Sequence, residues 1–363
     1  MAGRKTLTLG RKAPVATCVM RCGGKIERRV DLWSLHSDHI RWPVGGCDTC
    51  GHVRLARVFD PAARANLNCQ VFERQYNVAT TDQREETRAK KLQTTIARLA
   101  PLVERGEGKL LDVGAGEGWG RLVAEYFGMS YHIVEAQPEL AKRLERAGAT
   151  FTASTIPNLQ SRWAGQFEVM ILRRVLEHLP VPIGDLEILG QCLSTEGVIS
   201  VAVPNFERSK SRGNFVTDFL RLEHISYFNP SKLQWCLNQA RLAADSVHAA
   251  DEIWALARLG SSEVELDDER EVNGARFDSL MRADRRREIL NIVRVVALRS
   301  LSGLPGPIPR MARWAWWAVP SGSLDTSIVE CTIDRNRDRR SDASRSKPPR
   351  LRRITKGEGY TES

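Results

Sequence analysis

Three glycines, Gly114, Gly116 and Gly118, alternate with other residues directly after the apolar run 109–113. Glycines after a strand permit a tight turn and let backbone N–H groups approach a ligand closely. A helical pattern follows the third glycine. The spacing therefore predicts a ligand-binding turn between a strand and a helix, with Ala115 as one of its residues.

Two carboxylates indicate what this turn binds. The spacing is G-x-G-x-G, whereas nicotinamide and flavin sites use G-x-G-x-x-G. Asp112 lies two residues before the first glycine, where its charge repels a pyrophosphate but suits an ammonium group. Glu135 ends the next apolar run, twenty-one residues after Gly114, where an acidic side chain can accept both ribose hydroxyls. The pair favours S-adenosylmethionine, a nucleoside that carries an ammonium and a sulfonium.

A second group of residues predicts a metal centre. Four of the eight cysteines fall in the first fifty residues, which favours metal ligation over a disulfide framework. The expected ligands are Cys18, Cys22, Cys47 and Cys50. The second pair is a C-x-x-C knuckle followed by glycine, and the first pair is one residue wider. We expect a closed, structural zinc site, in which His36 or His39 could replace a cysteine that is not a ligand.

Apolar strands alternate with helical stretches from residue 109 onward, which predicts an α/β fold with a parallel sheet covered on both faces. The expected strands are Lys109–Val113, Tyr131–Glu135, Thr150–Ala153, Phe167–Leu172, Val198–Val203 and a final pair near Asp245–Arg258. The expected helices include Pro138–Ala147 and Asp185–Leu193.

The expected organisation is a zinc-ribbon at 1–55, a helical linker at 56–105, the α/β domain at 106–260, a C-terminal extension at 261–334 and a disordered basic tail at 335–363.

Residues 110–205 resemble the seven-stranded-sheet methyltransferases of the large Rossmann-like class. The resemblance rests on LLDVGAGEG, on the acidic residue of Val134-Glu135-Ala136, on FEVMIL followed by VLEHLP, and on GVISVAVPN, with EHISYF as a later match. It implies a methyltransferase whose S-adenosylmethionine contacts the glycine turn, Glu135, Ala136 and Leu172. The family's acidic residue after the third strand is replaced here, so Ser154 and Thr155 are expected to contact the adenine instead.

The histidines His178 and His224 are the candidate bases, because imidazole titrates near neutrality. A zinc-ribbon followed by this core resembles the sugar C-methyltransferases and related enzymes of bacterial polysaccharide clusters. In those enzymes His224 would be the base with Glu223 beside it, and Tyr76 would lie in the linking segment. The resemblance implies a sugar, nucleotide-sugar or glycan acceptor. Arg173-Arg174, at the expected floor of the acceptor pocket, could face an anionic substrate or form a surface pair.

The charge distribution bears on partners. Residues 335–363 contain ten Lys or Arg against four Asp or Glu, so this tail carries +6 of the net +10. A basic tail on a nearly balanced body argues against nucleic acid as the main partner. Methylation of nucleic acid or protein through the tail, and a non-catalytic zinc-ribbon interaction module, are the competing hypotheses.

Arginines and tryptophans within 281–319 are compatible with peripheral membrane contact. The N-terminus has no apolar signal segment, so we expect a cytoplasmic protein.

Overall fold

The computed structural model describes residues 13–14, 17–33, 41–58, 60, 64, 67, 81–207 and 223–261. All of them belong to one of two compact units, Met1–Ser323, and the second unit, Leu324–Ser363, lies outside the described residues. The expectations placed on His36, His39, Tyr76, 281–319 and the basic tail also lie outside the described residues.

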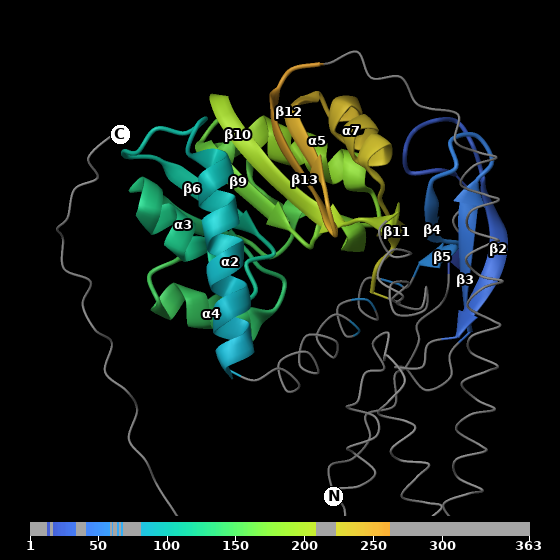
Figure 1. The fold of residues 1–363 in the computed structure, drawn as a ribbon, viewed down its shortest axis with the longest axis horizontal. Coiled ribbons are helices and arrows are strands. Elements are labelled where there is room, and N and C mark those ends of the chain that lie inside the picture. Colours follow the sequence, from blue (N-terminus) through green and yellow to red (C-terminus); the bar gives the residue numbers. More distant parts are fainter. Residues whose placement is uncertain are drawn as a thin grey trace, which may run out of the picture. The chain divides into compact units, whose positions relative to one another are not determined.

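A seven-stranded sheet forms the centre of the described structure (Figure 1). Its strands are β6 (Lys109–Val113), β7 (Ser130–Val134), β8 (Thr150–Ala153), β9 (Phe167–Arg173), β10 (Leu193–Pro204), β12 (Leu242–Ala249) and β13 (Glu252–Leu259). Their order is β12-β13-β10-β9-β6-β7-β8. The predicted Rossmann-like α/β fold is confirmed, with one difference: β13 runs antiparallel to both of its neighbours. The strand order reverses between β6 and β9, and ligands of open α/β sheets bind at such a reversal.

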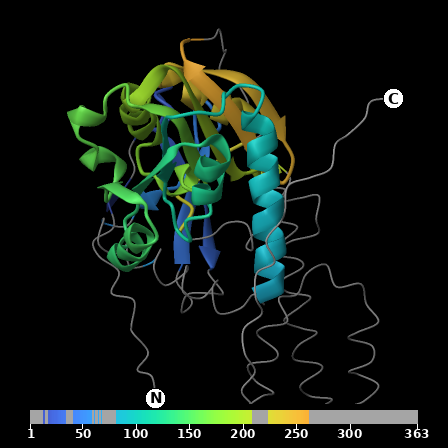
Figure 2. The ribbon, with the colours of Figure 1, turned by 90° about the vertical axis from the view of Figure 1, so that its left-hand side faces the viewer.

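Helices cover both faces of this sheet, as its apolar faces require. The helices are α2 (Thr81–Leu99), α3 (Gly120–Phe127), α4 (Pro138–Arg146), α5 (Pro182–Cys192) and α7 (Pro230–Gln239). Residues of α2, α3 and α4 pack against one face in one apolar cluster, and residues of α5 and α7 pack in a second cluster that covers the other face. Figures 1 and 2 both show α2 running along the outside of the sheet.

Local signals set the ends of these helices. The side chain of Asn229 accepts a hydrogen bond from the backbone N–H of Lys232 at 2.9 Å, and Pro230 occupies the first turn of α7. Asparagine caps and first-turn prolines both favour a helix start. Helix α3 ends at Gly128, whose φ of 78° is the left-handed conformation typical of a helix C-terminus. Among the described residues, no helix is long and apolar enough to cross a lipid bilayer.

A smaller sheet joins the N-terminal region to the main domain. Its strands, in the order β11-β4-β3-β2, are β11 (Ser226–Tyr227), β4 (Val53–Leu55), β3 (Arg41–Cys47) and β2 (Ile26–Trp33). The pair β1 (Ala13–Pro14) and β5 (Arg57–Val58) lies beside it in the chain. Strand β11 comes from the main domain and begins two residues after His224, and Figure 1 shows it next to β4. The N-terminal region therefore contributes three strands to a sheet that the main domain completes.

Candidate active site and metal centre

The glycine turn lies at the reversal of the strand order, between β6 and α3. Gly114, Gly116 and Gly118 have φ values of 69°, 54° and 76°, which glycine adopts without strain. A Cβ atom at Gly114 would lie 2.5 Å from a methyl group of Val175, so the position excludes any side chain. The turn therefore requires glycine both for its conformation and for its close approach to the segment that follows β9.

Glu135 fixes this turn to the end of β7. One of its carboxylate oxygens accepts the N–H of Gly116 at 2.8 Å, and the other accepts the N–H of Gln137 at 2.8 Å. The residue is buried. A carboxylate held by two backbone N–H groups has a fixed orientation at the strand end, next to the glycine turn.

Asp112 lies beneath the turn. It is buried, and its carboxylate accepts a hydrogen bond from the hydroxyl of Tyr131 at 2.8 Å. A Cβ atom at Gly120 would collide with this carboxylate, so Asp112 packs directly under the start of α3. Burial raises the pKa of Asp112 to about 7, although the hydrogen bond from Tyr131 opposes this shift.

This buried carboxyl makes stability depend on pH. The pKa of Asp112 is raised from 3.8 to about 7, so between these values the folded protein binds more protons than the unfolded chain. Stability attributable to Asp112 is therefore lost as pH rises toward 7. We therefore expect the melting temperature of Asp112→Asn, relative to that of the wild type, to rise between pH 5 and pH 8. The expected rise is on the order of 5 °C. Melting curves of the ligand-free protein test this, and a difference that does not change with pH would contradict it.

The other residues predicted to contact S-adenosylmethionine lie at the same edge of the sheet. Leu172 is buried near the end of β9, where it pairs with Val113 of β6. Ser154 and Thr155 are exposed at the end of β8, and both hydroxyls donate hydrogen bonds to the side-chain oxygen of Asn158. The residues predicted to contact the methyl donor thus all lie at or just after the carboxyl ends of strands: Glu135, Ala136, Ser154, Thr155 and Leu172. Ala136 is exposed after β7.

The two candidate bases lie together. The rings of His178 and His224 meet edge to face with their centroids 4.9 Å apart. Nδ1 of His178 lies 2.7 Å from the carbonyl oxygen of Glu223, and because a carbonyl only accepts, this nitrogen is the donor. In the neutral ring Nε2 is therefore left unprotonated and able to accept a proton. His178 closes the short helix η3 (Leu176–His178), whose first neighbour Val175 contacts the glycine turn.

Glu177, which the sequence alone favours as a structural residue, lies beside the two histidines. It is buried, and among the described residues neither carboxylate oxygen has a hydrogen-bond partner. One oxygen lies 4.0 Å from Nε2 of His178. Burial raises the pKa of Glu177 to about 7, against the opposing effect of Arg174. A carboxyl that titrates near neutrality beside two histidines can exchange protons with them.

The N-terminal sheet holds the His224 segment in place. Ile225 donates its N–H to the carbonyl of Glu177 at 2.7 Å, and its own carbonyl accepts the N–H of Leu55 at 2.9 Å. Ser226 then pairs with Arg54 across the two strands. A link of backbone hydrogen bonds therefore runs from β4, through the residues after His224, to η3. This pairing joins residues about 170 positions apart, and no local sequence signal could have revealed it.

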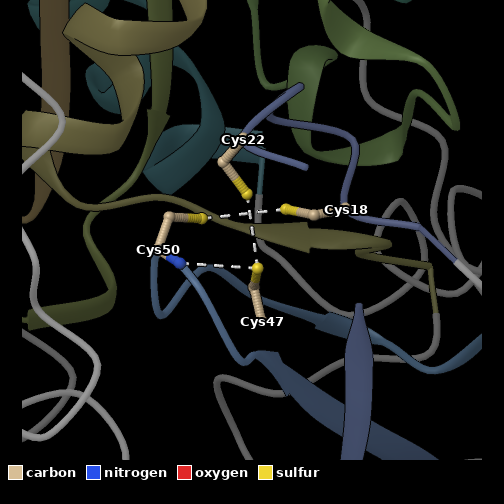
Figure 3. Close-up of side chains that lie close together, drawn as sticks. All are labelled: Cys18, Cys22, Cys47 and Cys50. Atoms are coloured by element: carbon tan, nitrogen blue, oxygen red, sulfur yellow. Dashed lines mark hydrogen bonds between the residues drawn. The ribbon is translucent and has the colours of Figure 1, made fainter. Parts of the chain in front are cut away.

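The four predicted metal ligands converge, as Figure 3 shows. Their sulfur atoms all lie within 4.8 Å of one another, with Cys18 and Cys50 at 3.7 Å and Cys22 and Cys47 at 3.4 Å. A tetrahedral zinc with Zn–S bonds of 2.3 Å places its sulfurs about 3.8 Å apart, so the spacing fits that ion. The backbone N–H groups of Thr49 and Cys50 point to the sulfur of Cys47, at 3.4 and 3.5 Å. The donor set is closed and consists of sulfur alone, which suits a structural metal.

The loop between Cys18 and Cys22 also contacts the main domain. Arg21 forms two hydrogen bonds to the carboxylate of Glu187 on α5, at 2.6 and 2.7 Å. The indole N–H of Trp235 on α7 donates to the carbonyl oxygen of Met20 at 2.8 Å. The cysteine-bearing region therefore contacts α5 and α7 of the main domain, in addition to the pairing of β4 with β11.

Comparison with known proteins finds a family model and a set of solved structures that are similar to part of this chain. Residues 84–247 match a family model described as a methyltransferase domain. No curated protein matches the sequence. Among solved structures, 1,6-didemethyltoxoflavin-N1-methyltransferase from Burkholderia thailandensis is similar over 58% of this chain and 96% of its own, with 15% identity and a TM-score of 0.43. A methyltransferase from Methanosarcina mazei is similar over 46% of this chain and 98% of its own, with 14% identity and a TM-score of 0.39.

Proposed function

We propose that this enzyme transfers the methyl group of S-adenosylmethionine to a sugar, nucleotide-sugar or glycan acceptor, with His224 as the base and His178 as the alternative. The observation that carries the proposal is the pair of adjoining histidines, a buried His224 and a partly exposed His178, beside the reversal of the strand order. Val175 links the two halves of the site: its side chain packs on Gly114 of the turn, and its carbonyl accepts the N–H of His178 at 2.9 Å.

On this proposal the chain's own residues divide the work. The glycine turn and Glu135 hold the donor, with the Glu135 carboxylate taking the ribose hydroxyls. Asp112 supports the turn from below and contributes a negative charge near the ammonium group. His224 removes the proton from an acceptor hydroxyl as the methyl group is transferred, or, for a carbon beside a ketone, removes the proton first to form the enolate that then takes the methyl group. Glu177 and Glu223 tune and orient the two imidazoles.

We also propose that the four-cysteine cluster binds one structural zinc ion. When bound, zinc supplies a rigid tetrahedral cross-link and no chemistry, because all four positions are taken by sulfur. Cys18, Cys22, Cys47 and Cys50 would be its ligands. The expected zinc-ribbon, linker and α/β domain boundaries remain part of this proposal, together with Tyr76 as a residue of the linking segment.

The acceptor class can be tested directly. Purified full-length protein is incubated with methyl-labelled S-adenosylmethionine and, separately, with nucleotide sugars, lipid-free glycans, RNA and a protein extract. We expect label in the nucleotide-sugar or glycan fraction. Label confined to RNA or protein would contradict the sugar proposal and favour the basic-tail hypothesis. Binding of the donor without transfer to any class would favour the non-catalytic module.

The role of Glu135 predicts a loss of donor affinity. Glu135→Ala removes two charge-assisted hydrogen bonds to the turn and the contacts to the ribose, so we expect donor affinity to fall about 10- to 100-fold. Isothermal titration calorimetry measures it. Glu139→Ala is the matched control, because Glu139 is an exposed residue of α4 whose carboxylate pairs with Lys142 at 3.2 Å. Equal affinity of the two variants would remove Glu135 from the donor site.

A further inference from the structure

Arginines and tryptophans gather at one end of the sheet, under helix α2. The guanidinium carbon of Arg98, on α2, lies 4.6 Å from the ring centre of Trp254 on β13. The guanidinium carbon of Arg173, at the end of β9, lies 4.9 Å from the same ring and 5.7 Å from the ring of Trp119. Two cationic groups thus share one aromatic ring, and Trp119 directly follows the glycine turn.

The sheet register explains how these side chains meet. Arg173 pairs with Ala202 of β10, and Ala202 pairs with Trp254 of β13, so the three residues form one row across the strands. Paired residues on neighbouring strands point to the same face. Because Ala202 has only a methyl group, it leaves room for the Arg173 side chain to extend over it toward Trp254.

The cluster has more positive charge than its neighbours neutralise. Glu252 bonds both Arg173 and Arg174, each at 2.6 Å. The buried Glu177 also attracts these two arginines without bonding them, so three arginines face two carboxyl groups. No carboxylate among the described residues forms an ion pair with Arg98. Three buried donor atoms, Nη1 of Arg98 and Nε and Nη1 of Arg173, have no hydrogen-bond partner there. The side chain of Arg173 is only 8% exposed, so water does not compensate these donors freely.

The environment of both guanidinium groups is unfavourable without a further anion. Burial lowers the pKa of Arg173, and burial together with the charge of Arg173 lowers the pKa of Arg98, in each case against the attraction of Glu252. Buried N–H groups without partners cost about 1–3 kcal/mol each, and more when charged. An anion placed between the two arginines would satisfy the donors and offset the repulsion.

We propose that Arg98 and Arg173 bind an anionic group of the methyl acceptor, either a carboxylate or a phosphate, with Trp119 and Trp254 as the apolar walls of this subsite. This inference rests on the proposed function, because it assigns the acceptor's charge. The position in the sheet favours the acceptor over the donor. Glu135, Ser154 and Thr155 lie at the ends of β7 and β8, on one side of the strand reversal, whereas Arg173 and Trp254 lie on β9 and β13, on the other.

The test compares two arginines that both lie over aromatic rings. Arg98→Met removes one charge from the cluster and leaves the Arg173–Glu252 pair intact. Arg105→Met is the matched control, because Arg105 lies 4.5 Å from the ring centre of Tyr126 at an exposed position outside the cluster. Thermal unfolding of the full chain is measured in increasing inorganic phosphate or sodium acetate, at constant ionic strength set with chloride.

We expect phosphate or acetate to stabilise the wild type and the Arg105→Met variant in a saturable way. Arg98→Met should raise the apparent dissociation constant of that anion about tenfold or more. Stabilisation by phosphate alone assigns a phosphate group to the acceptor, and stabilisation by acetate alone assigns a carboxylate. The absence of saturable stabilisation, or an equal response of the two variants, would overturn the proposal.

Donor titrations on the same proteins separate this inference from the proposed function. We expect Arg98→Met to bind S-adenosylmethionine as the wild type does, within about twofold. If donor affinity instead falls together with the anion response, the arginines hold the carboxylate of the donor and the acceptor subsite is refuted. If the wild type binds no donor at all, the proposed function itself fails, whatever the anions do.

Discussion

Replacement of His224 by alanine is expected to lower the rate of methyl transfer by about 10²- to 10⁴-fold while donor affinity changes by less than about twofold. His224 is buried and adjoins His178 edge to face at 4.9 Å. The imidazole is the group that can take the acceptor's proton as the methyl group is transferred. Its removal therefore costs the chemical step and leaves the glycine turn, which lies beyond Val175, unchanged.

Two measurements test this prediction. Single-turnover rates with saturating S-adenosylmethionine report the chemical step, and calorimetry reports donor binding. His248→Ala is the matched control, because His248 is an exposed histidine on the edge strand β12, which is separated from β9 by β13 and β10. If His224→Ala transferred methyl groups at the rate of the control, His224 would not be the base, and His178→Ala would then be the decisive variant.

Loss of the metal ligands is expected to have the second large effect. Cys47→Ala should reduce the zinc content from about one ion per chain to near zero and unfold the N-terminal sheet. Structural zinc sites of four cysteines contribute about 10–16 kcal/mol to folding, which is as much as the whole stability of a typical domain. Zinc is measured by elemental analysis and folding by circular dichroism.

Loss of the metal in Cys47→Ala should also loosen the segment next to His224. Strand β4 begins three residues after Cys50, and its Leu55 donates to the carbonyl of Ile225 next to His224. Hydrogen exchange of Ile225 and the β11 residues should therefore speed up in Cys47→Ala. Cys192→Ala is the control, because Cys192 is buried on α5 outside the four-cysteine cluster. A Cys47→Ala protein that stays folded, or a metal-free wild type with unchanged melting, would contradict a structural metal.

The sequence predicted the main sheet closely, and the reason is physical. Strands β6 and β8 begin and end where the apolar pattern predicted, because each is bounded by glycines or polar turn residues. The predicted strand Val198–Val203 was too short, since β10 extends over Leu193–Pro204 and contains the polar residues Ser194–Glu196. Polar residues at a largely exposed strand end carry no alternation signal, so this extension of β10 could not be predicted.

The contacts that complete the candidate site lie between distant segments. The hydrogen bond from Tyr131 to Asp112, the pairing of β4 with β11, and the shared ring of Trp254 each join residues from different elements. Residue type and spacing predict local structure, but they do not specify which elements meet. The four cysteines are the exception, because the spacing of a metal knuckle itself encodes the geometry of its ligands.

The central claim is that the glycine turn and Glu135 form the donor site, and calorimetric titration of the purified full chain with S-adenosylmethionine tests it most directly. We predict about one site per chain with a dissociation constant on the order of 1–100 µM, and competition by S-adenosylhomocysteine. A folded, metal-loaded protein that shows no binding heat and no competition at donor concentrations well above that range would contradict the claim.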